Sequence, residues 1–117
     1  MDLTNKGSFL KPSFEPYKMA NGDTAFIRVM SVKETDDWHA IIRSEQAKTE
    51  VTPIETIYVS HLVRTLCDDT GQRIFGDSDT AKLSEAPATI IAELYYASMK
   101  INVLTQEARD ELKKNSP

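Results

Sequence analysis

One short stretch, residues 67–79 (CDDTGQRIFGDSD), holds the residues of this chain that are best suited to chemistry. It combines the only cysteine of the chain with four aspartates and two glycines. Carboxylate oxygens at regular spacing would bind calcium, and a thiol close to a histidine would form a nucleophilic pair. The stretch therefore has three interpretations: a metal loop, a catalytic patch or a structural turn.

The positions of the glycines argue against a calcium loop. Such a loop needs a side-chain oxygen at its first position and glycine at its sixth. If Gly71 is the sixth residue, the first is Leu66, and if Gly76 is the sixth, the first is Gly71. We therefore expect no metal ion and interpret the stretch as a turn that ends one helix and caps the next. A non-standard acidic site is the alternative.

The spacing does not favour a thiol–imidazole pair either. His61 and Cys67 lie six residues apart in a predicted helix, about 1.7 turns, so their side chains point to different sides. His39, His61 and Cys67 lack the paired ligand spacing by which a zinc site is recognised. We expect a buried, unreactive cysteine, no catalytic residue, no cofactor and no enzymatic activity.

The composition is that of one acidic globular domain. The 117 residues are 40% hydrophobic, which is enough for a single core. A net charge of -4 gives no electrostatic reason to bind nucleic acid, and no apolar run approaches the ~20 residues that span a bilayer. We expect a single domain over residues 1–117, in the cytoplasm, with neither nucleic acid nor a membrane as partner.

The N-terminal part is predicted to contain little regular structure. Residues 1–22 are interrupted by glycine and proline and are predicted to form a partly flexible arm. The turn signal Asn21-Gly22-Asp23 and the β-rich segment after it predict a strand over residues 24–31, paired as a hairpin with the segment near Tyr17.

Residues 32–115 are predicted to form a helical region. Ser31 and Glu34 have the spacing of a capping box, so a helix begins there. Apolar periodicity and cap residues predict four further helices, at residues 53–66, up to 83, 87–104 and 106–114, the last capped by Thr105. The predicted fold class is mainly α (α+β), with four to five helices around one core and a small N-terminal strand or hairpin.

The helix over 87–104 carries the candidate partner-contact residues, Tyr95, Tyr96 and Met99. Tyr95 and Tyr96 are adjacent and so lie about 100° apart around a helix, and both can be core only if the helix is covered on two sides. So broad an apolar surface is expected to meet a partner or another copy of the chain. The alternative is a core residue beside an exposed ring, and Trp38 carries the same ambiguity.

A series of features over residues 52–115 matches a known pattern. They are the Asp-x-x-Gly turn 68–71, the apolar pair Ile74-Phe75, the acidic segment 77–79, Leu83, Asn102 with Leu104, and the ending Lys114-Asn115. In this order the features resemble the tail assembly chaperones of long-tailed (siphovirus-type) bacteriophages. The first 50 residues match that family only loosely.

The resemblance implies a protein of the host cytoplasm that binds the tape-measure protein, helps recruit the tail-tube protein and is absent from the mature virion. It also implies a frameshifted longer form of the chain as a partner, because Lys113-Lys114-Asn115 permits an adenine-rich slippery sequence. A homo-oligomer is a further expectation. The alternative is a small structural virion protein, such as a tail-completion or head–tail connector subunit. The third option is a small enzyme that uses Cys67 or the aspartates.

Overall fold

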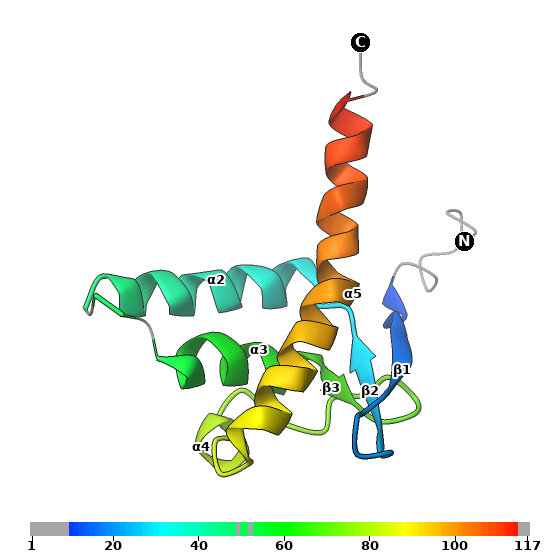
Figure 1. Ribbon diagram of the computed structural model, residues 1–117. Helices are drawn as coiled ribbons and strands as arrows, with labels where there is room; N and C mark the ends of the chain where they lie inside the picture. Colours follow the sequence, from blue (N-terminus) through cyan, green and yellow to red (C-terminus); the bar gives the residue numbers. More distant parts are fainter. Residues whose placement is uncertain (1–9, 49, 52, 115–117) are drawn as a thin grey trace.

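The computed structural model describes the backbone of residues 10–48, 50–51 and 53–114, and the side chains of these residues up to Asn102. Four helical units and a small antiparallel sheet share one core within this part of the chain, so the predicted α+β class is confirmed (Figure 1). Residues 1–9 of the predicted arm and the ending 115–117 lie outside the described residues.

The sheet has the strand order β1-β2-β3 and is antiparallel throughout. β1 (Phe14–Lys18) and β2 (Thr24–Arg28) form the predicted hairpin, and Gly22 supplies the positive φ of 94° that its turn needs. β1 therefore lies inside the segment predicted as an arm. β2 is shorter than predicted, because the chain leaves the sheet to reach the cap of the next helix.

α2 (Val32–Gln46) begins where the sequence predicted. The Ser31 hydroxyl accepts a hydrogen bond from the backbone N–H of Glu34, and the Glu34 carboxylate accepts one from the backbone N–H of Ser31. The capping box is confirmed. It fixes the direction of α2 as the chain leaves β2, and so places Trp38 against the core.

The predicted helix over 53–66 is a π-helical turn, η1 (Glu55–Val59), that continues into α3 (Ser60–Thr65). Its predicted end is wrong. Leu66 and Cys67 are extended and form β3, which pairs with Ile27 and Phe26 of β2. The pairing with β2 outweighs the helical periodicity. The backbone of Leu66 is also satisfied from within its own region, because its N–H donates to the Leu62 carbonyl and its carbonyl accepts from the N–H of Ile74, while its side chain stays in the core.

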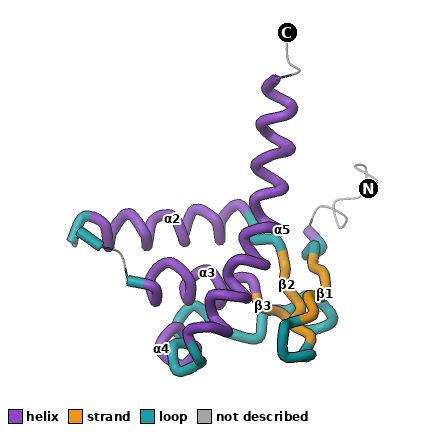
Figure 2. The backbone as a smooth tube through the Cα atoms, in the orientation of Figure 1, coloured by secondary structure: helices purple, strands orange, loops and turns teal. Residues whose placement is uncertain are grey.

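α4 (Thr80–Leu83) is the predicted short helix, and α5 (Ala88–Lys114) is one continuous helix of 27 residues. The predicted break at Thr105 is therefore wrong. No glycine or proline occurs between residues 88 and 114, and the glutamine, glutamate, alanine, arginine and lysine after Thr105 favour continuation of a helix. Figure 2 shows that the second half of α5 runs beyond the rest of the molecule.

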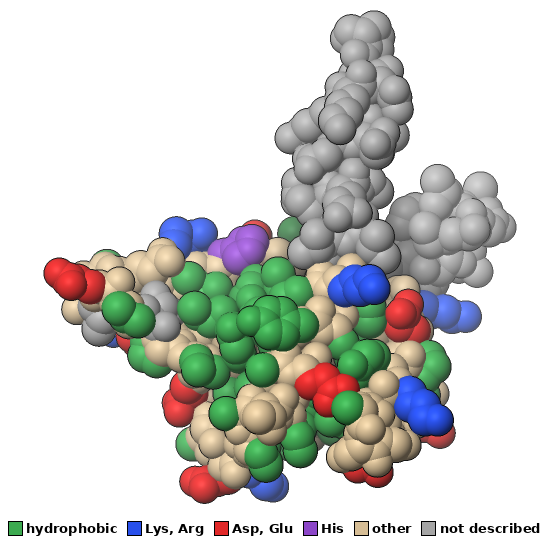
Figure 3. All heavy atoms as spheres, in the orientation of Figure 1, with side chains coloured by type: hydrophobic (Ala, Val, Ile, Leu, Met, Phe, Trp, Pro, Cys, Tyr) green, Lys and Arg blue, Asp and Glu red, His purple; other side chains and the backbone are tan. Residues whose placement is uncertain are grey.

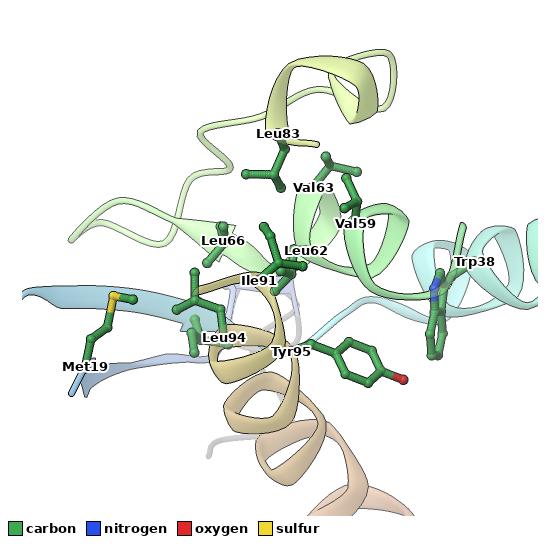
Figure 4. Close-up of a cluster of buried hydrophobic side chains, with 11 residues drawn as sticks. Met19, Trp38, Val59, Leu62, Val63, Leu66, Leu83, Ile91, Leu94 and Tyr95 are labelled. Atoms are coloured by element: carbon green, nitrogen blue, oxygen red, sulfur yellow. The ribbon is translucent and has the colours of Figure 1, made fainter. Parts of the chain in front are cut away.

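The core lies where α3, α5, α4 and the sheet meet (Figure 4). Its centre is formed by Ile27, Leu62 and Val63, which have no solvent-exposed surface. The other buried apolar side chains of the cluster are Met19, Trp38, Val59, Leu66, Leu83, Ile91, Leu94 and Tyr95. Within the described part of the chain, no helix has the length and apolar character to cross a membrane.

Candidate partner-binding surface

The three candidate contact residues on α5 differ in their exposure to solvent. Tyr95 is only 9% exposed, whereas Tyr96 is 63% exposed and Met99 is half-buried. A partner could therefore reach Tyr96 directly and Met99 in part, while Tyr95 supports them from beneath. The role of these residues in binding stays a prediction.

Tyr58 of η1 belongs to the same surface, although the sequence indicated only a core position for it. Its ring stacks on that of Tyr95, with centroids 4.1 Å apart and planes 12° apart. Its hydroxyl lies 3.3 Å from the Tyr96 hydroxyl, and the two rings meet edge to face. No signal in a single sequence pairs residues 58 and 96, because the contact depends on how two helices pack.

We call the surface formed by the exposed side chains of Ile54 and Tyr96 and the half-buried ring of Tyr58 the aromatic patch. Ile54 is 57% exposed and lies one helical turn before Tyr58. Figure 3 shows hydrophobic side chains gathered on this face, between α2 and α5, with charged side chains toward its edges. Adjacent exposed apolar side chains of this kind are typical of a protein-binding surface.

His61 lies beneath the aromatic patch and has no exposed surface. Its ring packs against Trp38 and Tyr95, with centroid distances of 4.7 and 5.3 Å. Its Nε2 lies 2.7 Å from the Ser98 hydroxyl, and its Nδ1 has no hydrogen-bond partner among the described residues. Burial, aided by the positive charge of Arg64, lowers the pKa of His61 to about 3. A neutral imidazole therefore ties α3 to α5.

Trp38, for which the sequence left a core or an interface position open, is a core residue with 6% of its surface exposed. Its indole N–H donates to the carbonyl of Ile57 at 3.0 Å, which joins α2 to η1. The aromatic side chains thus form a continuous series of contacts from Trp38 through His61 and Tyr95 to Tyr58, and Tyr96 lies at its exposed end. Because the buried members are held on three helices, the exposed ring is presented on a rigid support.

Two polar contacts hold α5 in the orientation that exposes Tyr96. The Asn102 side chain accepts a hydrogen bond from the backbone N–H of Met30 at 3.0 Å and donates to the carbonyl of Ser98 at 2.8 Å. One oxygen of Glu93 accepts from both the Tyr17 hydroxyl and the backbone N–H of Ala20, each at 2.8 Å. Asn102 belongs to the pattern that motivated the family resemblance, and the structure gives it a positioning role.

The stretch 67–79 runs from β3 to α4 and contains the predicted turn, but it does not end a helix as expected, because α3 already ends at Thr65. One oxygen of Asp68 accepts hydrogen bonds from the hydroxyl and backbone N–H of Thr70 and from the backbone N–H of Gln72. These bonds lower the pKa of Asp68. Gly71 has a φ of 89°, and a Cβ there would lie 2.7 Å from the Phe14 ring, so glycine is required for two reasons.

Two other aspartates of the stretch, Asp77 and Asp79, also have structural partners. Asp77 pairs with Arg73 at 2.7 Å, which lowers the pKa of the carboxyl, and Arg73 also reaches Glu34 at 3.4 Å. Asp79 accepts from the backbone N–H of Gly76 and does not cap α4, contrary to the expected cap. Across the described residues, no group of three or more metal-ligating side chains is close enough together to hold a metal ion.

Cys67 is 3% exposed, in agreement with the buried cysteine that was predicted. Burial raises the pKa of its thiol. It lies in β3, where its backbone pairs with Phe26 and with Arg73. A protonated thiol held inside a sheet is a weak nucleophile.

Comparison with known proteins gives a similarity at the level of the fold. No family model and no curated protein sequence matches the chain. The fold is similar to the solved structure of the bacteriophage HK97 tail assembly chaperone, with a TM-score of 0.54 and 14% sequence identity over 76% of this chain and 84% of the other. The resemblance that residues 52–115 suggested is therefore confirmed at the level of the fold: this chain folds like a phage tail assembly chaperone.

Proposed function

We propose that this chain acts in the assembly of a long-tailed phage tail, as a chaperone that binds the tape-measure protein and helps recruit tail-tube subunits. The fold shared with the HK97 tail assembly chaperone over 76% of this chain is the observation that carries the proposal. The chain then acts in the host cytoplasm through protein contacts and has no enzymatic activity of its own.

The surface of the molecule suits this task. A tape-measure protein is long, helical and apolar, so a factor that keeps it soluble needs apolar surface for contact and charge elsewhere. The aromatic patch supplies the first, and a chain with 27% charged residues and a net charge of -4 supplies the second. His61, Cys67 and Asp68 all have structural roles in the fold, which supports a non-catalytic function.

The composition of purified virions tests the proposal against a structural virion protein. An assembly chaperone acts before the tail is complete, so mass spectrometry of purified particles is expected to find the tail-tube protein and not this chain. A constant number of copies per particle would show that the chain is a connector or tail-completion subunit. Infected-cell lysate, in which the chain is expected, serves as the detection control.

The gene tests the frameshifted form separately. We expect an adenine-rich slippery heptamer over the codons of residues 113–115 and an open frame shifted by minus one after it. Mass spectrometry of infected cells is expected to detect a peptide that joins the two frames. If a stop codon follows at once in the shifted frame, the chain has no longer form. The chaperone role is then tested by the composition of the virion alone.

A further inference from the structure

Basic side chains gather where the end of β2, the start of α2, the end of α3 and the loop before α4 meet. Glu34 pairs with Arg28 at 2.8 Å and with Arg73 at 3.4 Å. Asp77 pairs with Arg73 at 2.7 Å and with Arg64 at 4.0 Å. Three arginines are therefore joined through two shared carboxylates.

Lys33 belongs to the same group. The pKa of Asp77 is lowered mainly by the hydrogen bond from Arg73 and further by the charges of Arg64 and Lys33, so Lys33 lies close enough to act on the same carboxylate. It is exposed and lies in the first turn of α2. We call Arg28, Lys33, Arg64 and Arg73 the basic cluster.

The basic cluster has more charge than its carboxylates neutralise. Among the described residues, only Glu34 and Asp77 form ion pairs with it. Four cations and two carboxylates leave an excess of two positive charges, in a chain whose net charge is -4. The cluster is thus a local positive region on an acidic protein, and it attracts negatively charged groups.

Arg64 is the least compensated cation of the cluster. Its side chain is only 5% exposed, and its guanidinium donates to the carbonyl of Ser60 at 2.7 Å. The 4.0 Å that separate it from Asp77 are too long for a hydrogen bond, and Asp77 is 61% exposed, so water weakens the attraction. A buried cation without a close carboxylate is costly, and a further anion beside it would lower that cost.

Exposed apolar side chains adjoin the basic cluster. Ile74 follows Arg73 and is 55% exposed, and Val32 precedes Lys33 and is 75% exposed. The backbone N–H of Ile74 donates to the carbonyl of Leu66 at 3.3 Å, which holds this part of the loop against β3. The surface therefore offers apolar contact beside positive charge, and both are fixed by the fold.

We propose that the basic cluster is a docking site for an acidic protein segment, whose carboxylates bind Lys33 and Arg73 in front of the buried Arg64. Apolar side chains of the same segment would cover Ile74. Nucleic acid is the less suitable partner, because it is bound through many phosphate contacts, whereas this cluster is compact, contains two carboxylates and belongs to an acidic chain.

Asp77 gives the site a built-in competitor. Its carboxylate already binds Arg73 and lies near Arg64, as a carboxylate of the partner would, but it is largely exposed and can be displaced. Removing its charge is therefore expected to strengthen binding of the partner. The site shares no residue with the aromatic patch and does not depend on the proposed function.

Two full-length variants test the site, each with a control of equal charge. Asp77→Asn removes the competing carboxylate, and its control is Asp69→Asn, because Asp69 is also exposed but forms no ion pair within the described part of the chain. Lys33→Glu reverses an exposed charge of the cluster, and its control is Lys100→Glu, at an exposed position on α5. An unchanged circular dichroism spectrum checks the fold of each variant.

A polyglutamate peptide is the probe, and its binding is followed by calorimetry and by NMR. In the wild type, the peptide is expected to shift the Arg73 Nε–H signal and the backbone N–H signals of Lys33 and Ile74. Asp77→Asn is expected to strengthen binding about threefold and Lys33→Glu to weaken it at least about threefold, which is the scale of one partly exposed ion pair. Both controls are expected to bind less differently from the wild type than their partners do.

Several results would overturn the proposal. They are a wild type that does not bind the peptide, shifts confined to other parts of the molecule, and an equal effect of Asp77→Asn and Asp69→Asn. A single-stranded DNA oligonucleotide is the second probe, and tighter binding of the oligonucleotide than of the peptide would show that the site takes phosphate instead. None of these results alters the virion test of the proposed function.

Discussion

His61 makes folding stability depend on pH in a range where carboxylates contribute little. The imidazole is fully buried and its pKa in the folded state is about 3, against an ordinary value of 6.5. Below pH 6.5 the unfolded chain binds a proton that the folded chain excludes, so the free energy of unfolding falls as the pH falls. One pKa unit corresponds to about 1.4 kcal/mol, so His61 is expected to remove about 2 kcal/mol between pH 7 and pH 5.

Carboxylates act mainly at lower pH. The pKa values of Glu34 and Asp77 are both held below their ordinary values. Burial by itself raises the pKa of Glu34, but the hydrogen bonds to Arg28 and Ser31 and the charge of Arg28 together outweigh it. The hydrogen bond from Arg73 lowers the pKa of Asp77. Their contribution to stability is present at neutral pH and is lost only as the pH falls below the ordinary carboxyl range. The change between pH 7 and pH 5 therefore reports on histidine.

Urea unfolding at pH 7 and pH 5 measures the effect. Trp38 is the only tryptophan and lies beside His61, so its fluorescence follows this region, while circular dichroism follows the whole fold. His61→Gln is expected to lower stability at pH 7 but to reduce the difference between the two pH values to near zero. His39→Gln is the matched control, because His39 is exposed, and it is expected to retain the full difference.

Two results would refute the reasoning about His61. One is a wild-type difference of less than about 0.5 kcal/mol between pH 7 and pH 5. The other is an equal pH dependence in His61→Gln and the wild type. If His61→Gln does not fold, NMR of the wild type decides the matter: the His61 ring signals are expected to stay unshifted from pH 7 to pH 5, and a titration in that range contradicts the buried neutral state.

Three other predictions concern the turn, the α5 anchor and the thiol. Gly71→Ala is expected to lower the free energy of unfolding in urea by more than about 1 kcal/mol, because the added Cβ would meet the Phe14 ring of β1. Gly22→Ala is the control and is expected to lower it by less, because Gly22 has a similar φ but no atom within 4 Å of the added Cβ. Equal losses in the two variants would contradict the steric explanation. Asn102→Ala is expected to lower the free energy of unfolding by about 1–3 kcal/mol by leaving the Met30 N–H unpaired, and a neutral effect would remove its positioning role. Cys67 is expected to react with a thiol reagent only in denaturant, so rapid reaction of the native protein would show that it is accessible.

Local signals in the sequence predicted the local features of the fold. The capping box of Ser31 and Glu34 involves residues three apart, and the hairpin turn around Gly22 depends on a single glycine, so both could be read directly. The turn role of Asp68 was also readable, because its hydrogen bonds reach only to Thr70 and Gln72.

Features that depend on distant residues were not predictable from the sequence. Leu66 continues an apolar helical stripe, and only its pairing with Ile27, far along the chain, makes it a strand residue. The partnership of Tyr58 with Tyr96 and of His61 with Ser98 arises from the packing of η1 and α3 on α5. The sequence therefore indicated that Tyr95 and Tyr96 lie on different sides of one helix, but not which of the two is exposed.

Co-expression with the tape-measure protein of the same phage tests the proposed role most directly. The soluble fraction of the tape-measure protein is measured with and without this chain, followed by gel filtration of the soluble material. The chaperone role predicts a large increase in soluble tape-measure protein and co-elution of the two chains. Tape-measure protein that stays equally insoluble, with this chain eluting alone, would contradict it.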